Sequence, residues 1–182
     1  MTKRVLIVIA ALVVAGALPT YAVGYKDTVV APKGWSDGLE RVAVFVTRAN
    51  TVVNASEVES QVESKLAAST KLPFRVVMGT RKAEQMMALG LDSYDDSRRQ
   101  EILEALQASA VLLVDIAHSA HAEATVKGAE VHVIVRVVAA DGKIRMRGES
   151  SGQAWNTLSS PENIARHSTL RLIGKATGLN LD

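Results

Sequence analysis

One short stretch is so uniformly apolar that the rest of the chain can be arranged around it. Residues 110–117 read Ala-Val-Leu-Leu-Val-Asp-Ile-Ala, apolar on both alternating faces and too short for a lone helix, which predicts a buried central strand. A second apolar run, residues 131–138, follows the pair Lys127-Gly128, and a third follows Asp141-Gly142. Because such pairs are typical of two-residue hairpin turns, we expect three consecutive antiparallel strands here.

Upstream of these strands, strand-like and helix-like patterns alternate. Residues 41–46 are almost wholly apolar and predict a first strand, and residues 72–78 predict a second. Capping residues and helical spacing predict four helices. The first begins at Asn54, the second covers residues 83–89, the third covers residues 97–109 with Ser97 as cap, and the last runs from Ser160-Pro161 to Gly178. In the first of these helices we expect Glu57, Glu59 and Glu63 to face away from the apolar side.

This order of elements predicts a single α/β domain over residues 41–182. Strand, helix, strand, helix, strand gives three parallel strands joined by right-handed crossovers, and the two hairpins add antiparallel strands to one edge. The expected architecture is a mixed five-stranded sheet flanked by about four helices. Residues 23–40 show no period and are interpreted as an extended N-terminal arm, with Trp35 packed against the domain.

The first residues have the pattern of a secretory signal peptide. Lys3 and Arg4 precede an uncharged apolar run, and Thr20 and Ala22 supply the small residues of an A-x-A cleavage site. The run is shorter than the roughly 20 residues that span a bilayer, so cleavage near Ala22 is favoured over a retained anchor. We expect a periplasmic or secreted protein that begins at Val23 and has no integral membrane span.

Charge and cysteine content narrow the possible functions. The chain has 21 basic and 19 acidic residues, and Lys3 and Arg4 account for the difference, so the exported protein would be neutral. A neutral chain gives no electrostatic reason to expect nucleic acid as a partner. The absence of cysteine excludes disulfides, a thiolate nucleophile and a lipid-modified cysteine.

The order of elements resembles an envelope family that comprises the curli-secretion protein CsgG, the outer-membrane activators of penicillin-binding proteins and the amino-terminal domain of TolB. The residues that carry the resemblance are 41–46, 58–66, 73–77, 95–104, 110–114 and the Asp141-Gly142 hairpin. The resemblance implies a non-enzymatic domain that binds another envelope protein and uses no cofactor. Self-association is an open alternative.

A serine hydrolase motif occurs at Gly148-Glu149-Ser150-Ser151-Gly152, which matches G-x-S-x-G. The motif is expected at a strand-to-helix turn, but residues 153–159 show no helical period. The available partners, Glu162 and His167, lie five residues apart on one predicted helix, a poor arrangement for a catalytic base and its orienting acid. An exported hydrolase is therefore the third hypothesis, and we name no catalytic residue.

One cluster has metal-ligand character if Lys127-Gly128 is the turn. In that register Glu123 lies opposite His132, His121 lies nearby on the same face, and His118 points to the other face. Such a set could hold a divalent ion, which makes a periplasmic metal-binding or small-ligand-binding protein the second hypothesis. Cross-strand polar pairs on a solvated face are commoner, so no metal is expected.

Two other groups of residues are weaker candidates. Residues 92–96 are acidic, but the spacing of an EF-hand loop and its closing glutamate are absent, so helix capping is the simpler interpretation. Met86 and Met87 are interpreted as fillers of core gaps, with an adaptable partner surface as the alternative.

The expected partner site is a face of the second hairpin. With Asp141-Gly142 as a two-residue turn, Arg136 lies opposite Arg147 and Val138 lies opposite Arg145, while Val135 and Val137 occupy the apolar face. Directly opposed like charges are unfavourable by about 0.2 to 1 kcal/mol. We therefore expect Arg136, Arg145 and Arg147 to be solvated or to meet an acidic partner.

Overall fold

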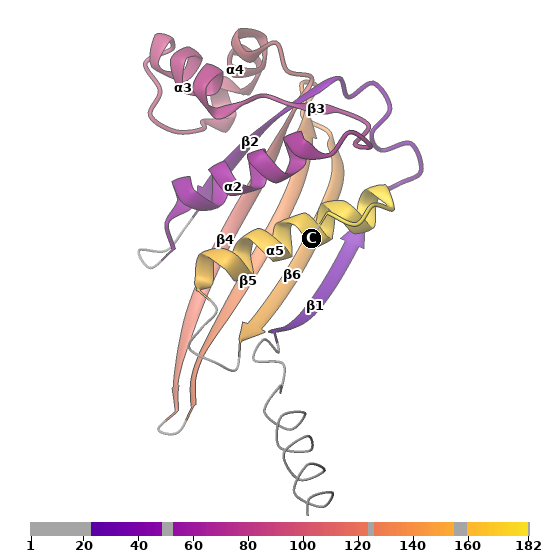
Figure 1. The fold of residues 1–182 in the computed structure, drawn as a ribbon. Helices are drawn as coiled ribbons and strands as arrows, with labels where there is room; N and C mark the ends of the chain where they lie inside the picture. The colour runs from indigo at the N-terminus through magenta and orange to yellow at the C-terminus, as the bar shows by residue number, and fades with distance from the viewer. Residues whose placement is uncertain (1–22, 49–52, 124–125, 155–159, 182) are drawn as a thin grey trace, which may run out of the picture.

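A six-stranded sheet runs through the molecule in the order β1-β6-β5-β4-β2-β3 (Figure 1). The computed structural model describes residues 23–48, 53–123, 126–154 and 160–181. The strands are β1 (Val23–Val30), β2 (Arg41–Arg48), β3 (Arg75–Val76), β4 (Ala110–Glu123), β5 (Val126–Ala139) and β6 (Ile144–Ala154). The α-helices are α2 (Ala55–Ala68), α3 (Gly79–Ala88), α4 (Arg99–Leu106) and α5 (Pro161–Thr177), and a 3₁₀ turn, η1 (Asp96–Arg98), precedes α4. Within these residues, no helix has the length and apolar character needed to cross a membrane.

The sheet is mixed, as predicted, but it has six strands and not five. β2 pairs in parallel with β3 and β4, and β4, β5, β6 and β1 follow one another in antiparallel pairing. The additional strand is β1, which comes from the segment interpreted as an extended arm. Its inward position Asp27 interrupts the apolar alternation, so the sequence pattern alone does not identify this segment as a strand.

Contacts with α5 explain how β1 holds a charged residue on its inner face. The Asp27 side chain has no exposed surface and accepts hydrogen bonds from Ser150 Oγ at 2.7 Å and Arg171 Nη2 at 2.9 Å, and it pairs with Lys175 Nζ at 2.8 Å. Burial acts to raise the pKa of Asp27, but bonds from Lys175, Ser150 and Arg171 outweigh it and lower that pKa. Trp35, as predicted, packs against the domain and donates from Nε1 to the Ala176 carbonyl at 3.0 Å.

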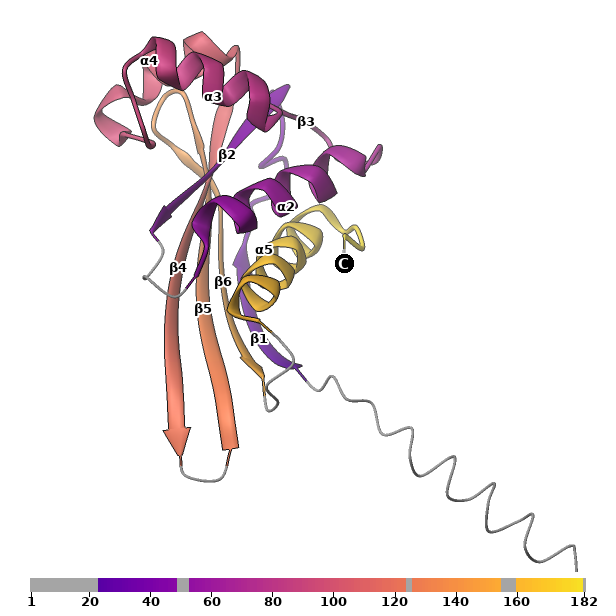
Figure 2. The ribbon, with the colours of Figure 1, turned by 60° about the vertical axis from the view of Figure 1, so that its left-hand side comes forward.

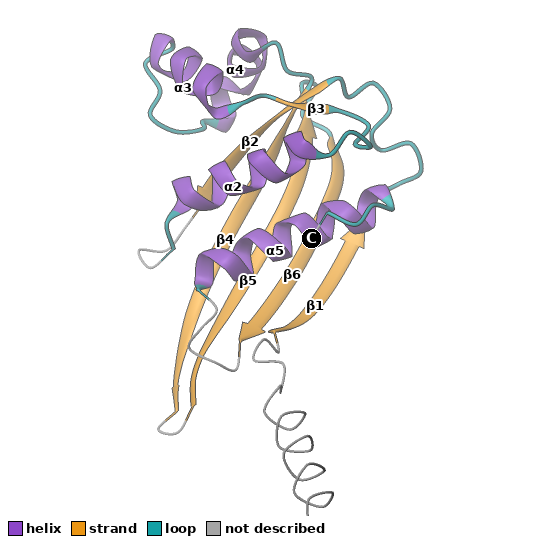
Figure 3. Cartoon of the chain, viewed as in Figure 1, coloured by secondary structure: helices purple, strands orange, loops and turns teal. Residues whose placement is uncertain are grey.

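Helices cover the two faces of the sheet unequally (Figure 3). α2 and α5 pack on one face over the full set of long strands, and their core includes Val58, Leu66, Ile164 and Leu172. On the opposite face, α3 and α4 form a smaller core that includes Ile102 and contacts only the end of the sheet where β4 begins. Figure 2 shows α3 and α4 gathered at this end, so no helix of the described residues covers the remainder of the second face.

The turn between β4 and β5 lies earlier than Lys127-Gly128, which corrects the predicted register. The two strands remain paired as far as Glu123 and Val126, and residues 124–125 between them lie outside the described part of the chain. His132 therefore lies opposite Ala117, and every partner is shifted by six residues from the predicted pairing. Because the shift is even, the same residues still face the core, and the alternating apolar pattern cannot distinguish the two registers.

Candidate functional site

The part of the sheet that no described helix covers is the main candidate for a functional surface. We call it the open face: the side of β4, β5, β6 and β1 opposite α2 and α5, beyond the reach of α4. It includes the partly buried or exposed side chains of Asp115, His132, Ile134, Arg136, Arg147 and Glu149. β5 alternates strictly here, with Val131, Val133, Val135 and Val137 wholly buried on the other side.

The predicted register of the second hairpin is confirmed at the positions that define this face. Arg136 pairs directly with Arg147, and Val135 pairs with Gly148. Each arginine has an acidic partner: Arg136 Nη2 bonds Asp115 Oδ2 at 2.8 Å, and Arg147 Nη2 bonds Glu149 Oε1 at 2.6 Å. The two directly opposed positive charges are tolerated because each guanidinium pairs with a different carboxylate.

The predicted pairing of Val138 with Arg145 is wrong, and the acidic partner of Arg136 was not predicted. Val138 pairs with Ile144 and not with Arg145, because the register shifts between Val137 and Val138. Asp115 was missed because the predicted β4–β5 register placed it opposite Ala140, beyond reach of Arg136. In the observed register Asp115 lies opposite Ile134, diagonal to Arg136, where cross-strand side chains meet.

A hollow of about 590 Å³ opens between this face, the β5–β6 turn and the start of α4. Arg99 reaches into it from α4, and its Nη2 lies 2.9 Å from the position that a Cβ on Gly142 would occupy. Asp96 accepts from Tyr94 Oη at 2.8 Å and from Arg99 Nη1 at 2.8 Å, and these bonds lower the pKa of Asp96. Burial, together with Asp96, raises the pKa of Tyr94 well above its usual range.

The acidic stretch before α4 acts in capping, as predicted, although with a different residue. Asp95 accepts from the Ser97 backbone N–H at 2.9 Å and so caps η1, a role we assigned to Ser97. The pKa of Asp95 falls because Ser97 donates to its carboxylate. Ser97 lies within the 3₁₀ turn, and α4 begins only at Arg99.

The histidine cluster is separated by the observed register. The backbone places His121 opposite Gly128 and Glu123 opposite Val126, whereas His132 lies opposite Ala117. Ala117 and His121 are four positions apart, which is roughly 13 Å along a strand. His132 Nδ1 instead lies 3.1 Å from Ser151 Oγ on β6. The side chains of His121 and Glu123 lie outside the described part, and the described residues contain no group of three candidate ligands.

The G-x-S-x-G motif lies within a strand and serves to pack a helix. Ser150 is wholly buried in β6, far from a strand-to-helix turn, and its hydroxyl donates to Asp27. A Cβ on Gly152 would lie 2.4 Å from Ile164, and one on Gly148 would lie 3.1 Å from Leu172, so these glycines let α5 approach the sheet closely. Glu162 accepts the Asn54 backbone N–H at 3.1 Å, which does not involve Ser150.

A buried ion cluster occupies the place where open α/β sheets commonly bind ligands. β2 leads to α2 on one face and β3 leads to α3 on the other, so the carboxyl ends of these strands border a crevice, here about 470 Å³. Lys82 Nζ donates within it to the Val44 carbonyl at 2.6 Å, to Glu59 at 2.5 Å and to Glu63. Each N–H of this ammonium therefore has a partner.

Glu63 corrects the expectation that it faces solvent. It is 4 % exposed, because Lys82 from α3 reaches across α2 and pairs with it. Burial raises the pKa of Glu63, and the Lys82 ammonium offsets only part of that effect. Met86 beside it is buried, as a filler of core gaps would be, whereas Met87 is 77 % exposed.

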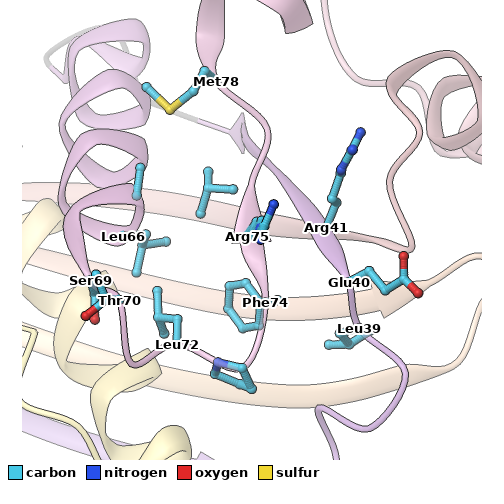
Figure 4. A pocket seen from close by; sticks show the side chains of 13 residues that line it. Leu39, Glu40, Arg41, Leu66, Ser69, Thr70, Leu72, Phe74, Arg75 and Met78 are labelled. Carbon is cyan, nitrogen blue, oxygen red and sulfur yellow. The ribbon is translucent and has the colours of Figure 1, made fainter.

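A further hollow lies at the opposite end of β2. It has a volume of about 850 Å³ and lies beside the outer edge of β3, between α2 and the segment that leads into β2 (Figure 4). Leu66, Leu72 and Phe74 form an apolar floor, and Arg41 and Arg75 stand at its rim.

Comparison with known proteins establishes the fold and no closer relationship. No protein-family model and no curated protein matches the chain. Among solved structures, the PelC dodecamer from Paraburkholderia phytofirmans is similar, with 11% identity, a TM-score of 0.58, and coverage of 86% of this chain and 99% of that one. The LpoB C-terminal domain from Salmonella enterica matches less well, with 21% identity, a TM-score of 0.47, and coverage of 65% and 88%. The chain therefore shares its fold with PelC, and the resemblance to CsgG and TolB stays a prediction.

Proposed function

We propose that this protein is an exported, non-enzymatic domain of the cell envelope that binds another envelope protein through the open face of its sheet. The observation that carries the proposal is the open face itself. Arg136 and Arg147 lie on it beside the partly or largely exposed Ile134 and Ile144, and Arg99 reaches the same hollow from the start of α4. Arginine next to exposed apolar side chains is typical of protein interfaces.

Two features support the non-enzymatic part of the proposal against the alternatives. The serine of the hydrolase motif is buried, and the small residues around it are needed for packing α5. The crevice at the carboxyl ends of β2 and β3 is lined by the protein's own carboxylates and ammonium, which pair with one another and so are less available to a small ligand. A periplasmic ligand-binding protein is therefore less favoured than an adaptor.

Affinity capture from envelope extract tests the proposal. A C-terminally tagged protein should retain a stoichiometric protein partner, and Arg147→Glu should lose it. Lys71→Glu is the matched control, because it makes the same charge change at an exposed loop position outside the open face. Capture of no partner by the parent protein, or equal loss with Lys71→Glu, would contradict the proposal.

Self-association is a second candidate, and a free sheet edge favours it. β2 pairs with β4 only as far as Asp115, so the edge of β4 from Ile116 to Glu123 has no neighbouring strand among the described residues. Unpaired strand edges are templates for pairing with another chain. PelC, which shares this fold, forms a dodecamer. Light scattering on the purified protein should then give a mass several times that of one chain, and a monomer at high concentration would exclude this candidate.

A further inference from the structure

The hollow bounded by Arg99, Arg136 and Arg147 has the chemistry of a binding site for a single carboxylate. The three guanidinium groups come from α4, β5 and β6 and line the same space of about 590 Å³. Among the described residues, the carboxylates of Asp96 and Asp115 line it with them, and Glu149 pairs with Arg147 beside it. Each guanidinium therefore has one carboxylate partner.

The guanidinium groups keep donors that their carboxylate partners do not use. Arg99 and Arg136 each pair with one lining carboxylate through a single terminal nitrogen. Arg147, with 52% of its side chain exposed, pairs with Glu149 through one terminal nitrogen. A guanidinium has five N–H donors in a planar fork, so the other terminal N–H groups of the three arginines can donate to a further planar, two-oxygen anion.

The floor of the hollow selects against a small, highly charged anion. Leu113, Ile134, Val138 and Ile144 are apolar, and Ile144 is 53% exposed. An occupant therefore gains most if it combines an apolar stem with one negative charge, as a glutamate side chain does.

From this geometry we infer that the hollow binds an acidic side chain, a glutamate, that the protein partner inserts between Arg99, Arg136 and Arg147. The inference rests on the proposed function for the identity of the partner, but the site itself can be tested without that partner. Arg147 is the most exposed of the three and makes the first contact, while Arg99 and Arg136 hold the carboxylate against the apolar floor.

Nuclear magnetic resonance with defined peptides tests the inference on the exported protein. The probe is acetyl-Ala-Leu-Glu-Leu-Ala-amide, and its matched control replaces the glutamate with glutamine. The glutamate peptide should shift the Nε–Hε signals of Arg99, Arg136 and Arg147, and the glutamine peptide should not. Arg147→Gln should weaken binding about tenfold, as expected for a lost charge-assisted hydrogen bond.

Lys143→Gln and inorganic phosphate complete the experiment. Lys143 lies in the same turn region, is 77% exposed and does not line the hollow, so its replacement should leave binding unchanged. Equal binding of both peptides, equal weakening by Lys143→Gln, or stronger occupancy by phosphate would overturn the inference. Peptide binding without any captured partner would support the carboxylate site and contradict the proposed function. A captured partner that still binds the Arg147→Gln variant would support the proposed function and contradict the carboxylate site.

Discussion

The two faces of β5 show how one strand serves two purposes. Val131, Val133, Val135 and Val137 point toward α5 and have no exposed surface. Between them, His132, Ile134 and Arg136 point to the open face and are only partly buried. The first set supplies the buried apolar area that stabilises the fold, and the second is free to vary with function. Substitutions at neighbouring positions should therefore have opposite consequences.

The largest effect is expected for Val135→Asp, which tests the covered face. An unpaired carboxylate would be buried against α5, and we expect a loss of more than about 4 kcal/mol, enough to abolish cooperative unfolding. Thermal melts followed by circular dichroism measure it, with Arg136→Glu as the neighbouring control. If Val135→Asp melts like the parent protein while Arg136→Glu collapses, the two faces have been assigned in reverse.

Lys82→Met extends the comparison to charged side chains, because the Lys82 ammonium is buried whereas the guanidinium groups of the open face are partly exposed. Its removal leaves Glu59 and Glu63 without their cation, and breaking such a buried cluster should cost about 3 to 5 kcal/mol. Urea unfolding provides the measurement. Replacing Lys82, Glu59 and Glu63 together by apolar residues should recover most of the loss, and failure to recover it would point to a different role for Lys82.

Gly152→Ala tests how closely α5 lies on the covered face. The new methyl would clash with Ile164 and Tyr25, and the required shift of both should cost about 1 to 3 kcal/mol. Gly24→Ala is the matched control, since Gly24 lies on the adjacent strand and nothing is within 4 Å of its added Cβ. A similar loss in both variants would show that strand propensity, and not helix packing, sets the cost.

Asp27→Asn tests the attachment of β1 and should depend on pH. Loss of the carboxylate should cost about 1 to 3 kcal/mol at pH 7, because the buried Ser150 hydroxyl and the two cations lose their ionised acceptor. The folded-state pKa of Asp27 is lowered, so its contribution is present above the unfolded value near 3.9 and is lost as pH falls through the folded pKa. Urea unfolding of both proteins at pH 7 and below pH 3 should show the difference shrinking in acid, and a difference that persists would contradict this assignment.

The smallest effect on stability is expected for Arg147→Glu. The side chain is 52% exposed, so the free energy of unfolding should change by no more than about 0.5 kcal/mol. Its effect should appear instead in partner capture. If this variant unfolds more readily than Gly152→Ala, the open face contributes to the core and the comparison between the faces fails.

Several features of the fold were predictable because their causes are local. The second hairpin is in register around Arg136 and Arg147 because Asp141-Gly142 supplies a turn in which Gly142 adopts a φ of 83°. The last helix begins at Pro161 after the Ser160 cap and ends at Gly178, whose φ is 72°, as the capping residues predict. In each case the residues that decide the structure lie within a few positions of one another.

The candidate site was predictable only in part, for a reason that the first hairpin makes clear. Arg136 and Arg147 were placed correctly, but Asp115 and Arg99 were not identified as their neighbours. Asp115 depends on the β4–β5 register, which the alternating pattern leaves open to any even shift. Arg99 reaches the hollow only because α4 folds back over the end of the sheet, and no local pattern encodes that approach.

The sequence by itself determined where most of the strands and helices form, which side of those strands is apolar, and that cysteine chemistry is absent, since composition, period and caps are properties of neighbouring residues. The tertiary structure decided the rest. It made a strand of residues 23–30 through a bond between Asp27 and Arg171, 144 positions apart, and it buried Glu63 through Lys82, 19 positions away. Those contacts form only when distant segments meet, because a buried charge is stable only where a partner from elsewhere in the chain arrives to neutralise it.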